Sequence, residues 1–255
     1  MRLLYRGVCL LCIIMTFLIR SSIVRWRCKN EISKNSALAA IVHHYTKKIL
    51  KLFRVNVSVT GSSELSNNAP CLIVSNHLSY LDVLMLTSVK PTIFLSHKGI
   101  EREPVIGTIV SGGGTIFLDK SAKTKLSGEM RHLSDMLKDG NTMTIFPEGG
   151  TGDGEGVRTF HPALIEAAVR AGTPVLPVCL QYSRINGESV TKENKDLIFI
   201  YGDTPFLPHI WKIFKKLDNL DVTVKVFDKI PVYGANRKAI AIQAREKIAG
   251  EFIPV

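Results

Sequence analysis

The chain has 255 residues, 45% of them hydrophobic, which is enough to bury the core of one large α/β domain or of two small domains. Its net charge of +11 is unevenly distributed: residues 1–60 contain 11 Lys and Arg and one acid, whereas the other 195 residues contain 22 basic and 21 acidic side chains. A nucleic-acid-binding protein is expected to carry basic groups on its folded domain as well, so this distribution argues against that class. Basic residues beside apolar sequence instead indicate attraction to an anionic membrane surface.

An apolar run covers residues 7–19, between Arg6 and Arg20. As a helix it measures roughly 20 Å, which is shorter than the roughly 30 Å hydrocarbon core of a bilayer. We expect an uncleaved anchor, which either spans the membrane by extending to Val24 or lies half-inserted. A cleaved signal peptide is the alternative, but no small-x-small cleavage site follows the run.

A second candidate for membrane contact covers residues 36–54. Its apolar residues recur at helical spacing and its basic residues fall elsewhere on the helical wheel. The segment is therefore either a surface helix packed on the domain or a helix in the membrane interface. We expect residues 1–54 to form the membrane anchor with its amphipathic helix, and residues 55–255 to form one α/β domain.

Five cysteines are scattered along the chain and imply no disulfide framework, which is consistent with a domain that faces the cytoplasm. Cys9 and Cys12 form a C-x-x-C pattern inside the apolar run, where thiols that pack as small hydrophobes are more common than a redox or zinc pair. Arg25, Arg27 and Lys29 follow the run and favour the same cytoplasmic side, which in a bacterium is that of the inner membrane.

Strand and helix signals alternate after residue 55, with short connections. The expected strands are 55–60, 71–75, 92–96, 115–118, 142–146, 174–181, 197–201 and 222–227. The expected helices are 79–89, a short one starting near Pro104, 121–138, 162–171 and 236–249. This alternation predicts a single domain with a largely parallel mixed sheet flanked by helices. In such sheets, reactive groups gather at the carboxyl ends of the strands.

Residues 75–82, Ser-Asn-His-Leu-Ser-Tyr-Leu-Asp, place His77 at the end of one of these strands. Ser79 suits a helix N-cap with Asp82 as its capping-box partner, so helix stabilisation alone can explain this acid. The first helical turn also brings the Asp82 carboxylate back toward His77, where it can hold one ring nitrogen and leave the other to take a proton. We predict that His77 is a general base and that Asp82 orients it.

A glycine-rich stretch, Phe-Pro-Glu-Gly-Gly-Thr-Gly-Asp-Gly, covers residues 146–154. Turn chemistry alone can account for its glycines. The same glycines also let backbone N–H groups approach an anionic group closely. We predict that Glu148, fixed at the rim of the sheet, contacts a substrate hydroxyl and that Gly149 belongs to the same binding loop.

Lys120 follows another expected strand and is either a solvated lysine or a cation for a phosphate, with Lys98 and Arg158 as helpers. The sequence contains no G-x-S-x-G elbow, P-loop, G-x-G-x-x-G, H-E-x-x-H or zinc-type cysteine set. We expect no cofactor and no metal. His77 and Asp82 as metal ligands are an alternative, for which no third ligand lies close in sequence.

These motifs together resemble the glycerolipid acyltransferases of the 1-acylglycerol-3-phosphate O-acyltransferase type. Four blocks follow the family's order: Asn76-His77-x4-Asp82; Lys98 through Pro104, Gly107 and residues 116–120; residues 146–149; and residues 175–178. The resemblance covers residues 70–180 and implies transfer of a fatty acyl group from an acyl-CoA or acyl carrier protein thioester to a lysolipid hydroxyl. It also implies that Asn76 belongs to the substrate site, that N-terminal helices seat the domain on the membrane, and that no metal is needed.

The chain departs from the family pattern in two places. Lys120 stands where an arginine is usual, so the charge survives but bidentate phosphate binding does not. Residues 150–154 replace a Thr-Arg-Ser continuation, and their Thr-Gly-Asp-Gly ending is similar to bacterial relatives that include lyso-ornithine lipid acyltransferases. The expected acceptor is 1-acyl-sn-glycerol-3-phosphate, with lyso-ornithine lipid or another lysophospholipid as the alternative. A non-catalytic membrane lipid-binding protein is the alternative from another class, and the intact base and acid argue against it.

Overall fold

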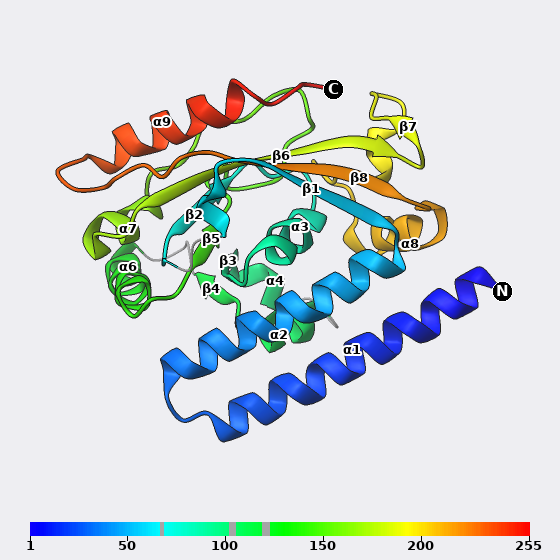
Figure 1. Ribbon diagram of the computed structural model, residues 1–255, viewed down its shortest axis with the longest axis horizontal. Coiled ribbons are helices and arrows are strands. Elements are labelled where there is room, and N and C mark those ends of the chain that lie inside the picture. The colour runs from blue at the N-terminus through cyan, green and yellow to red at the C-terminus, as the bar shows by residue number, and fades with distance from the viewer. Residues whose placement is uncertain (67–68, 102–105, 119–122) are drawn as a thin grey trace.

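The computed structural model describes residues 1–66, 69–101, 106–118 and 123–255. Within them, an eight-stranded mixed sheet lies at the centre, with helices on both of its faces and a long helical hairpin at the N-terminus (Figure 1). The predicted class, a largely parallel mixed sheet flanked by helices and preceded by N-terminal helices, is confirmed. The predicted division at residue 54 falls between the hairpin and the first strand, and stays a prediction.

The strands follow the order β1-β8-β6-β2-β5-β3-β4, and β7 pairs with the end of β6. Their bounds are β1 Val55–Gly61, β2 Leu72–Ser75, β3 Ile93–His97, β4 Ile116–Leu118, β5 Met143–Ile145, β6 Val175–Ile185, β7 Glu188–Ser189 and β8 Leu220–Val226. Neighbouring strands are parallel except where β6 meets β8 and β7. The carboxyl ends of β2, β5 and β3 therefore share one edge of the sheet.

Helices cover both faces of this sheet. They are α3 Leu81–Val89, α4 Lys98–Glu101, α5 Ile106–Gly112, α6 Lys123–Lys138, α7 Ile165–Ala171, α8 Phe206–Lys216 and α9 Arg237–Ala249, with single turns of 3-10 helix at Ser63–Leu65 and Lys195–Leu197. Figure 1 shows α9 on one face, over β6, and α3 and α8 on the other. Gly172 ends α7 in the left-handed conformation, as its place after an apolar helical run predicts.

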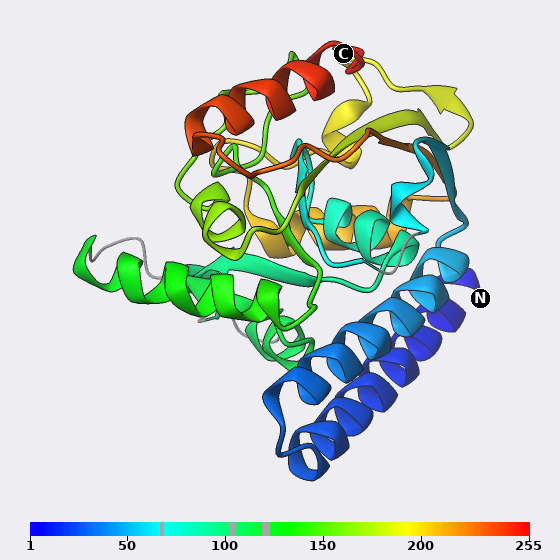
Figure 2. The same ribbon diagram turned by 60° about the vertical axis from the view of Figure 1, so that its left-hand side comes forward.

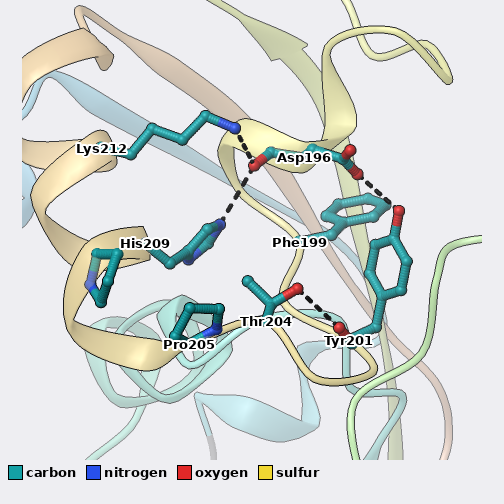
Figure 3. Close-up of a pocket in the computed structure, with 8 residues that line it drawn as sticks. Asp196, Phe199, Tyr201, Thr204, Pro205, His209 and Lys212 are labelled. Carbon is teal, nitrogen blue, oxygen red and sulfur yellow. Dashed lines mark hydrogen bonds between the residues drawn. The ribbon is translucent and has the colours of Figure 1, made fainter.

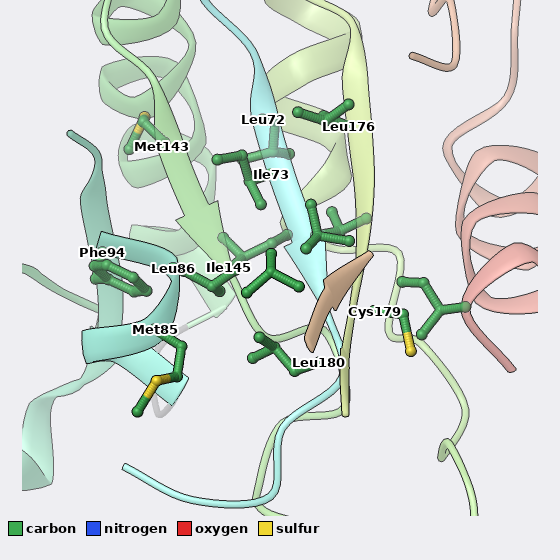
Figure 4. Packing of buried hydrophobic residues seen from close by; sticks show 14 of the residues in the cluster. Leu72, Ile73, Met85, Leu86, Phe94, Met143, Ile145, Leu176, Cys179 and Leu180 are labelled. Carbon is green, nitrogen blue, oxygen red and sulfur yellow. The ribbon is translucent and has the colours of Figure 1, made fainter. Parts of the chain in front are cut away.

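The hydrophobic core lies along the central strands. All residues of β2 and β5 are buried, and so are the first six of β6. Leu72, Ile73, Ile145, Leu176 and Leu180 pack against one another across these strands (Figure 4). Fully burying one such side chain stabilises the fold by about 1.5–3 kcal/mol, so a strand buried on both faces holds the loop that follows it firmly in place.

The N-terminal hairpin consists of α1 Arg2–Arg27 and α2 Glu31–Leu52, which pack along each other (Figure 2). Among the helices of the described residues, α1 is long and apolar enough to cross a bilayer, and little of it is buried. Beside the exposed Leu3 and Tyr5, a set of exposed apolar residues recurs every three or four positions along its length: Leu4, Val8, Leu11, Met15, Ile19, Ile23 and Trp26. This spacing forms one continuous stripe on the outer side of the hairpin.

One predicted strand is wrong. Residues 197–201 form the end of a 3-10 turn and an irregular segment instead of a strand, with Ile198 and Phe199 buried. Their backbone groups bond to the loop after β2: the Ser79 hydroxyl donates to the Ile198 carbonyl at 2.7 Å, and the Ile200 N–H donates to the Leu78 carbonyl at 3.1 Å. These bonds replace a strand ladder, so the apolar segment braces that loop.

Helix α8, strand β7 and the short helix α4 were not predicted. Helix α8 begins after Pro205 and contains Pro208, and prolines obscure a helical pattern although both fit the first turn. Strand β7 completes a hairpin that turns at Asn186 and Gly187, whose φ values are 54° and 87°. Asn-Gly at positive φ is the usual sequence of a two-residue hairpin turn, so this signal was present in the chain.

Candidate active site

His77 and Asp82 meet directly after β2. The buried strand ends at Ser75, and a five-residue loop leads into α3. The Asp82 side chain turns back from the first helical turn, and its Oδ2 lies 2.7 Å from Nδ1 of His77. The Asp82 side chain is fully buried, whereas that of His77 is 18% exposed. The two residues that the sequence paired are therefore brought together in the geometry expected of a base and its orienting acid.

The same carboxylate also fixes the loop. Oδ2 of Asp82 accepts the backbone N–H of Leu78 at 2.7 Å and that of Ser79 at 2.9 Å. Helix α3 begins at Leu81 rather than at the expected Ser79. The Ser79 hydroxyl donates to the Ile198 carbonyl at 2.7 Å and accepts the Leu81 N–H at 3.3 Å. The acid thus fulfils half of the predicted capping box and holds the imidazole at once.

The imidazole of His77 has a defined orientation. Because a carboxylate only accepts hydrogen bonds, the contact with Asp82 requires a proton on Nδ1 and leaves Nε2 as the acceptor. The ring stacks on Phe146 with centroids 3.9 Å apart and planes at 8°. Stacking on one side and an ionic partner at Nδ1 leave the ring little freedom. Nε2 is therefore available for a substrate proton in a fixed direction.

Tyr182 completes this arrangement, and the sequence analysis missed it. Its hydroxyl donates to Oδ1 of Asp82 at 2.5 Å from strand β6. Burial raises the pKa of the Tyr182 phenol well above its ordinary value, and the neighbouring Asp82 raises it further. The phenol therefore remains a donor. No sequence signal joins two residues a hundred positions apart, and only the β2–β6 pairing brings them together.

Glu148 holds the loop together from the opposite side. Its Oε1 accepts the backbone N–H of His77 at 2.8 Å, and its Oε2 accepts that of Arg158 at 3.0 Å. Burial raises the pKa of the Glu148 carboxyl, although the two N–H donors oppose this shift. Both oxygens are engaged by backbone and the residue is only 7% exposed, and the contact with a substrate hydroxyl stays a prediction. Glu148 acts here as a brace between two loops.

Asn76 also has a role that differs from the predicted one. Its side-chain amide donates to the Leu180 carbonyl at 2.9 Å, and its carbonyl oxygen accepts the Leu180 N–H at 2.8 Å. With both polar ends used and 1% of the residue exposed, Asn76 ties the end of β2 to β6 instead of presenting a group to a ligand. Asn76 therefore positions the neighbouring His77 by fixing the end of β2.

The glycine-rich loop wraps around His77. The Gly152 N–H donates a hydrogen bond to the His77 carbonyl at 2.7 Å. Gly149 has a positive φ of 80°, and its N–H donates to the Phe146 carbonyl. Gly154 also has a positive φ, of 88°, and a Cβ there would lie 2.5 Å from Phe199. Glycine is therefore required at Gly154, both by its conformation and by the close approach of the 197–201 segment.

Two of the three predicted cations, Lys98 and Arg158, belong to the described residues. Lys98 is exposed and directly follows β3, whose carboxyl end shares an edge with that of β2. Arg158 is exposed and close enough to act electrostatically on Glu148. Lys120 lies outside the described residues. The roles predicted for these three cations stay predictions.

A cavity of about 300 Å³ opens beside the loop, between the 196–205 segment and α8 (Figure 3). On its α8 side, His209 and Lys212 point toward the Asp196 carbonyl, at 3.3 and 2.9 Å. His209 also contacts the hydroxyl of Tyr80, three residues after His77, at 3.0 Å. Helix α8 is thereby joined to the catalytic loop.

The assembled groups suit proton transfer from a hydroxyl. A neutral imidazole held by a carboxylate can accept a proton at Nε2 and later return it. Within the described part of the chain, no group of three or more His, Cys, Asp and Glu side chains is arranged to hold a metal ion.

Three comparisons with known proteins bear on this site. A family model described as Acyltransferase matches residues 56–181. The chain is 32% identical over 180 residues to a lyso-ornithine lipid O-acyltransferase of Pseudomonas aeruginosa, a match covering 70% of this chain and 66% of that protein. It is 30% identical over 157 residues to a 1-acyl-sn-glycerol-3-phosphate acyltransferase of Neisseria gonorrhoeae, covering 61% and 57%.

The fold is similar to a solved structure. The crystal structure of the 1-acyl-sn-glycerophosphate acyltransferase of Thermotoga maritima superposes with a TM-score of 0.68 over 98% of this chain and 92% of that one, at 18% identity. This likeness extends over the N-terminal hairpin as well as the sheet. The chain thus spans just under two thirds of the length of the first curated relative, while its fold is matched almost from end to end.

Proposed function

We propose that this chain, which belongs to the acyltransferase family, transfers a fatty acyl group from a thioester to the free hydroxyl of a lysolipid. The observation that carries the proposal is the 2.7 Å contact between Nδ1 of His77 and Oδ2 of a fully buried Asp82. It leaves the partly exposed imidazole with one nitrogen able to take a proton. The names of the relatives support transfer of an acyl group to a lipid acceptor, and the thioester donor is part of the proposal.

In the proposed mechanism, Nε2 of His77 takes the proton from the acceptor hydroxyl as its oxygen attacks the thioester carbonyl. A tetrahedral oxyanion forms, and backbone N–H groups near the loops stabilise it. The C–S bond then breaks, and the thiol leaves with the proton that His77 returns. Asp82 keeps the imidazole oriented and stabilises its charged form between these two steps. No cofactor is required beyond the acyl donor, which is acyl-CoA or an acyl carrier protein.

The proposed acceptor is 1-acyl-sn-glycerol-3-phosphate, as the name of the Neisseria relative suggests. Lyso-ornithine lipid is the second candidate, because the Pseudomonas relative carries that name and residues 150–154 of the chain contain no arginine. Lys120, Lys98 and Arg158 are the cations proposed to hold an anionic headgroup.

The proposed location is the cytoplasmic face of a membrane, with α1 lying in one leaflet. Near one end of α1, Arg6 donates to the Leu217 carbonyl at 2.6 Å, and near the other Arg25 donates to the Ser111 carbonyl. A helix joined to the same domain at both ends does not extend away from it across a bilayer. The exposed apolar stripe of α1 is therefore proposed to face the hydrocarbon in the interfacial orientation.

An acceptor panel tests the proposal. Purified full-length protein would receive labelled acyl-CoA or acyl carrier protein with lysophosphatidate, lysophosphatidylglycerol or lyso-ornithine lipid. We expect a diacyl product from at least one acceptor, with lysophosphatidate most active. If every acceptor is inert and a thiol reagent detects no release of CoA, the chain is a lipid-binding protein without catalysis.

A further inference from the structure

Helix α8 presents an apolar face that nothing in the described part of the chain covers. Leu207 is 59% exposed and Trp211 is 55% exposed. They lie four residues apart, and Lys215 follows four residues later, so the three side chains form one stripe along the helix. The opposite face of α8 carries the buried His209 and Ile213. One face of α8 therefore packs on the domain, and the opposite face is exposed.

The charge of this helix is wholly basic. Residues 206–216 contain three lysines and no acid. The Lys215 ammonium lies 4.6 Å from the centroid of the Trp211 ring, and Lys216 is exposed beside it. Tryptophan at the boundary between apolar and basic side chains is typical of helices at a lipid–water interface, where the indole lies at headgroup level and lysines meet anionic lipids.

The stripe of α8 continues into the apolar face of α1. Trp211 stacks on Phe214 with centroids 5.4 Å apart, and the Phe214 ring approaches within 3.8 Å of the position of a Cβ on Gly7. On α1, Leu4, Val8 and Leu11 flank this point and are exposed. Figure 1 shows the N-terminal end of α1 close to α8. Two apolar surfaces from opposite ends of the chain thus meet at one contact.

We propose that α8 is a second bilayer contact of this protein, binding the surface of an anionic phospholipid membrane through Leu207, Trp211 and Lys215. The inference rests on the proposed membrane location and extends it from the N-terminal hairpin to the α/β domain itself.

This contact places the acceptor site near the lipid. From the same helix, Phe206 packs edge-to-face on Tyr80 at 4.8 Å and His209 contacts its hydroxyl. Tyr80 lies three residues after His77. Helix α8 is only about 16 Å long, and its first residues contact Tyr80. A membrane bound along α8 therefore lies close to the catalytic loop. A lysolipid can then reach Nε2 of His77 without leaving the bilayer surface.

The two tryptophans of the chain, Trp26 and Trp211, make the test direct. In full-length protein carrying Trp26→Phe, Trp211 is the sole indole. Reconstituted into phosphatidylcholine vesicles containing phosphatidylglycerol, it should be quenched when the lipids carry bromine near the headgroup, and should emit at shorter wavelength than in neutral vesicles. The Lys215→Gln, Lys216→Gln double variant should lose most of this dependence on anionic lipid.

Matched positions separate a local contact from general adsorption. In a background of Trp26→Phe and Trp211→Phe, Leu207→Trp should be quenched by the brominated lipid. Tyr233→Trp should not, because Tyr233 is fully exposed beyond the opposite end of β8. Quenching of Trp26 alone, with Trp211 unaffected, would overturn the proposal. So would a Trp211 emission that changes with protein concentration and not with lipid, which would assign the surface to a second copy.

Acyl transfer measured on the same vesicles keeps the two proposals apart. Quenching of Trp211 without any transfer would remove the proposed function and keep the bilayer contact. Acyl transfer without quenching of Trp211 would keep the proposed function and remove the bilayer contact of α8.

Discussion

At the scale of single residues, the site depends on one buried carboxylate with four donors. Asp82 accepts from Nδ1 of His77, from two backbone N–H groups and from the hydroxyl of Tyr182. Burying a carboxylate without hydrogen-bond partners costs free energy. The four donors offset this cost and allow the Asp82 carboxylate to lie fully buried next to the imidazole. Each donor therefore contributes both to the fold and to the direction of the imidazole.

Tyr182→Phe tests this arrangement. It removes one donor and leaves Oδ1 of Asp82 buried and unpaired, which should lower the free energy of unfolding by about 1–3 kcal/mol. Because the remaining bonds still hold His77, we expect kcat to fall with a displaced pH profile while KM for the acceptor stays constant.

Tyr201→Phe is the matched control, since the Tyr201 hydroxyl also donates to a carboxylate, that of Asp196, at an exposed position. Denaturant unfolding and pH–rate profiles of both variants distinguish the cases. A wild-type pH profile for Tyr182→Phe would assign this tyrosine to packing alone.

At the scale of elements, the catalytic loop is held by irregular segments as well as by α3. The irregular 197–201 segment bonds to Leu78 and Ser79, and its Phe199 lies against Gly154 of the glycine-rich loop. The loop after β2 is therefore fixed both by later loops of the chain and by Asp82 in the first turn of its own helix. Small structural changes in those segments should therefore alter the position of His77.

Gly154→Ala should destabilise the protein by about 1–3 kcal/mol, because a side chain at this positive φ is strained and its Cβ would overlap the Phe199 ring. Gly156→Ala is the matched control: no atom lies within 4 Å of its added Cβ, and its φ is not left-handed. Thermal unfolding of the two variants compares them directly. Equal melting temperatures would show that the Gly154 contact is not required.

His209 adds a pH dependence at the joint between α8 and α3. Burial lowers the pKa of its imidazole below the ordinary 6.5, Lys212 adds to this effect, and the Asp196 carbonyl opposes it. Below the unfolded pKa, the unfolded chain takes up a proton that the folded chain resists. The stability that neutral His209 contributes is therefore present above that pKa and is lost as the pH falls toward the folded pKa.

His209→Gln should flatten this part of the stability curve. Melting temperatures of wild type and variant, followed downward from neutral pH, give the measurement. A wild-type slope that survives the substitution would assign the pH dependence to other groups.

At the scale of the whole molecule, the hairpin and the domain form one body with a shared apolar surface. Both ends of α1 are bonded to the domain, which favours a helix lying in one leaflet. An N-terminal tag and a C-terminal tag should then be accessible from the same side of oriented membrane vesicles. A helix that spans the bilayer would expose the two tags on opposite sides, and a protease-protection experiment decides between them.

The sequence was informative where a signal is local. His77 and Asp82 are five residues apart and joined by one helical turn, so their contact followed from spacing. Tyr182 was not found, because its partner lies across a sheet pairing that spacing does not encode. The 197–201 segment was taken for a strand because its residues are apolar and β-prone, which records its burial but not the direction of its hydrogen bonds. Glu148 and Asn76 lie beside His77 as their sequence positions indicate. Both side chains are buried and hydrogen-bond to backbone groups that hold the loop.

One measurement tests the account most directly: the rate of acyl transfer by His77→Ala with the acceptor that the panel identifies. Removing a positioned base should lower turnover by about 10² to 10⁴-fold, while the protein remains folded. His132→Ala, an exposed histidine on α6, is the control and should keep full activity. Undiminished transfer by correctly folded His77→Ala protein would contradict the account.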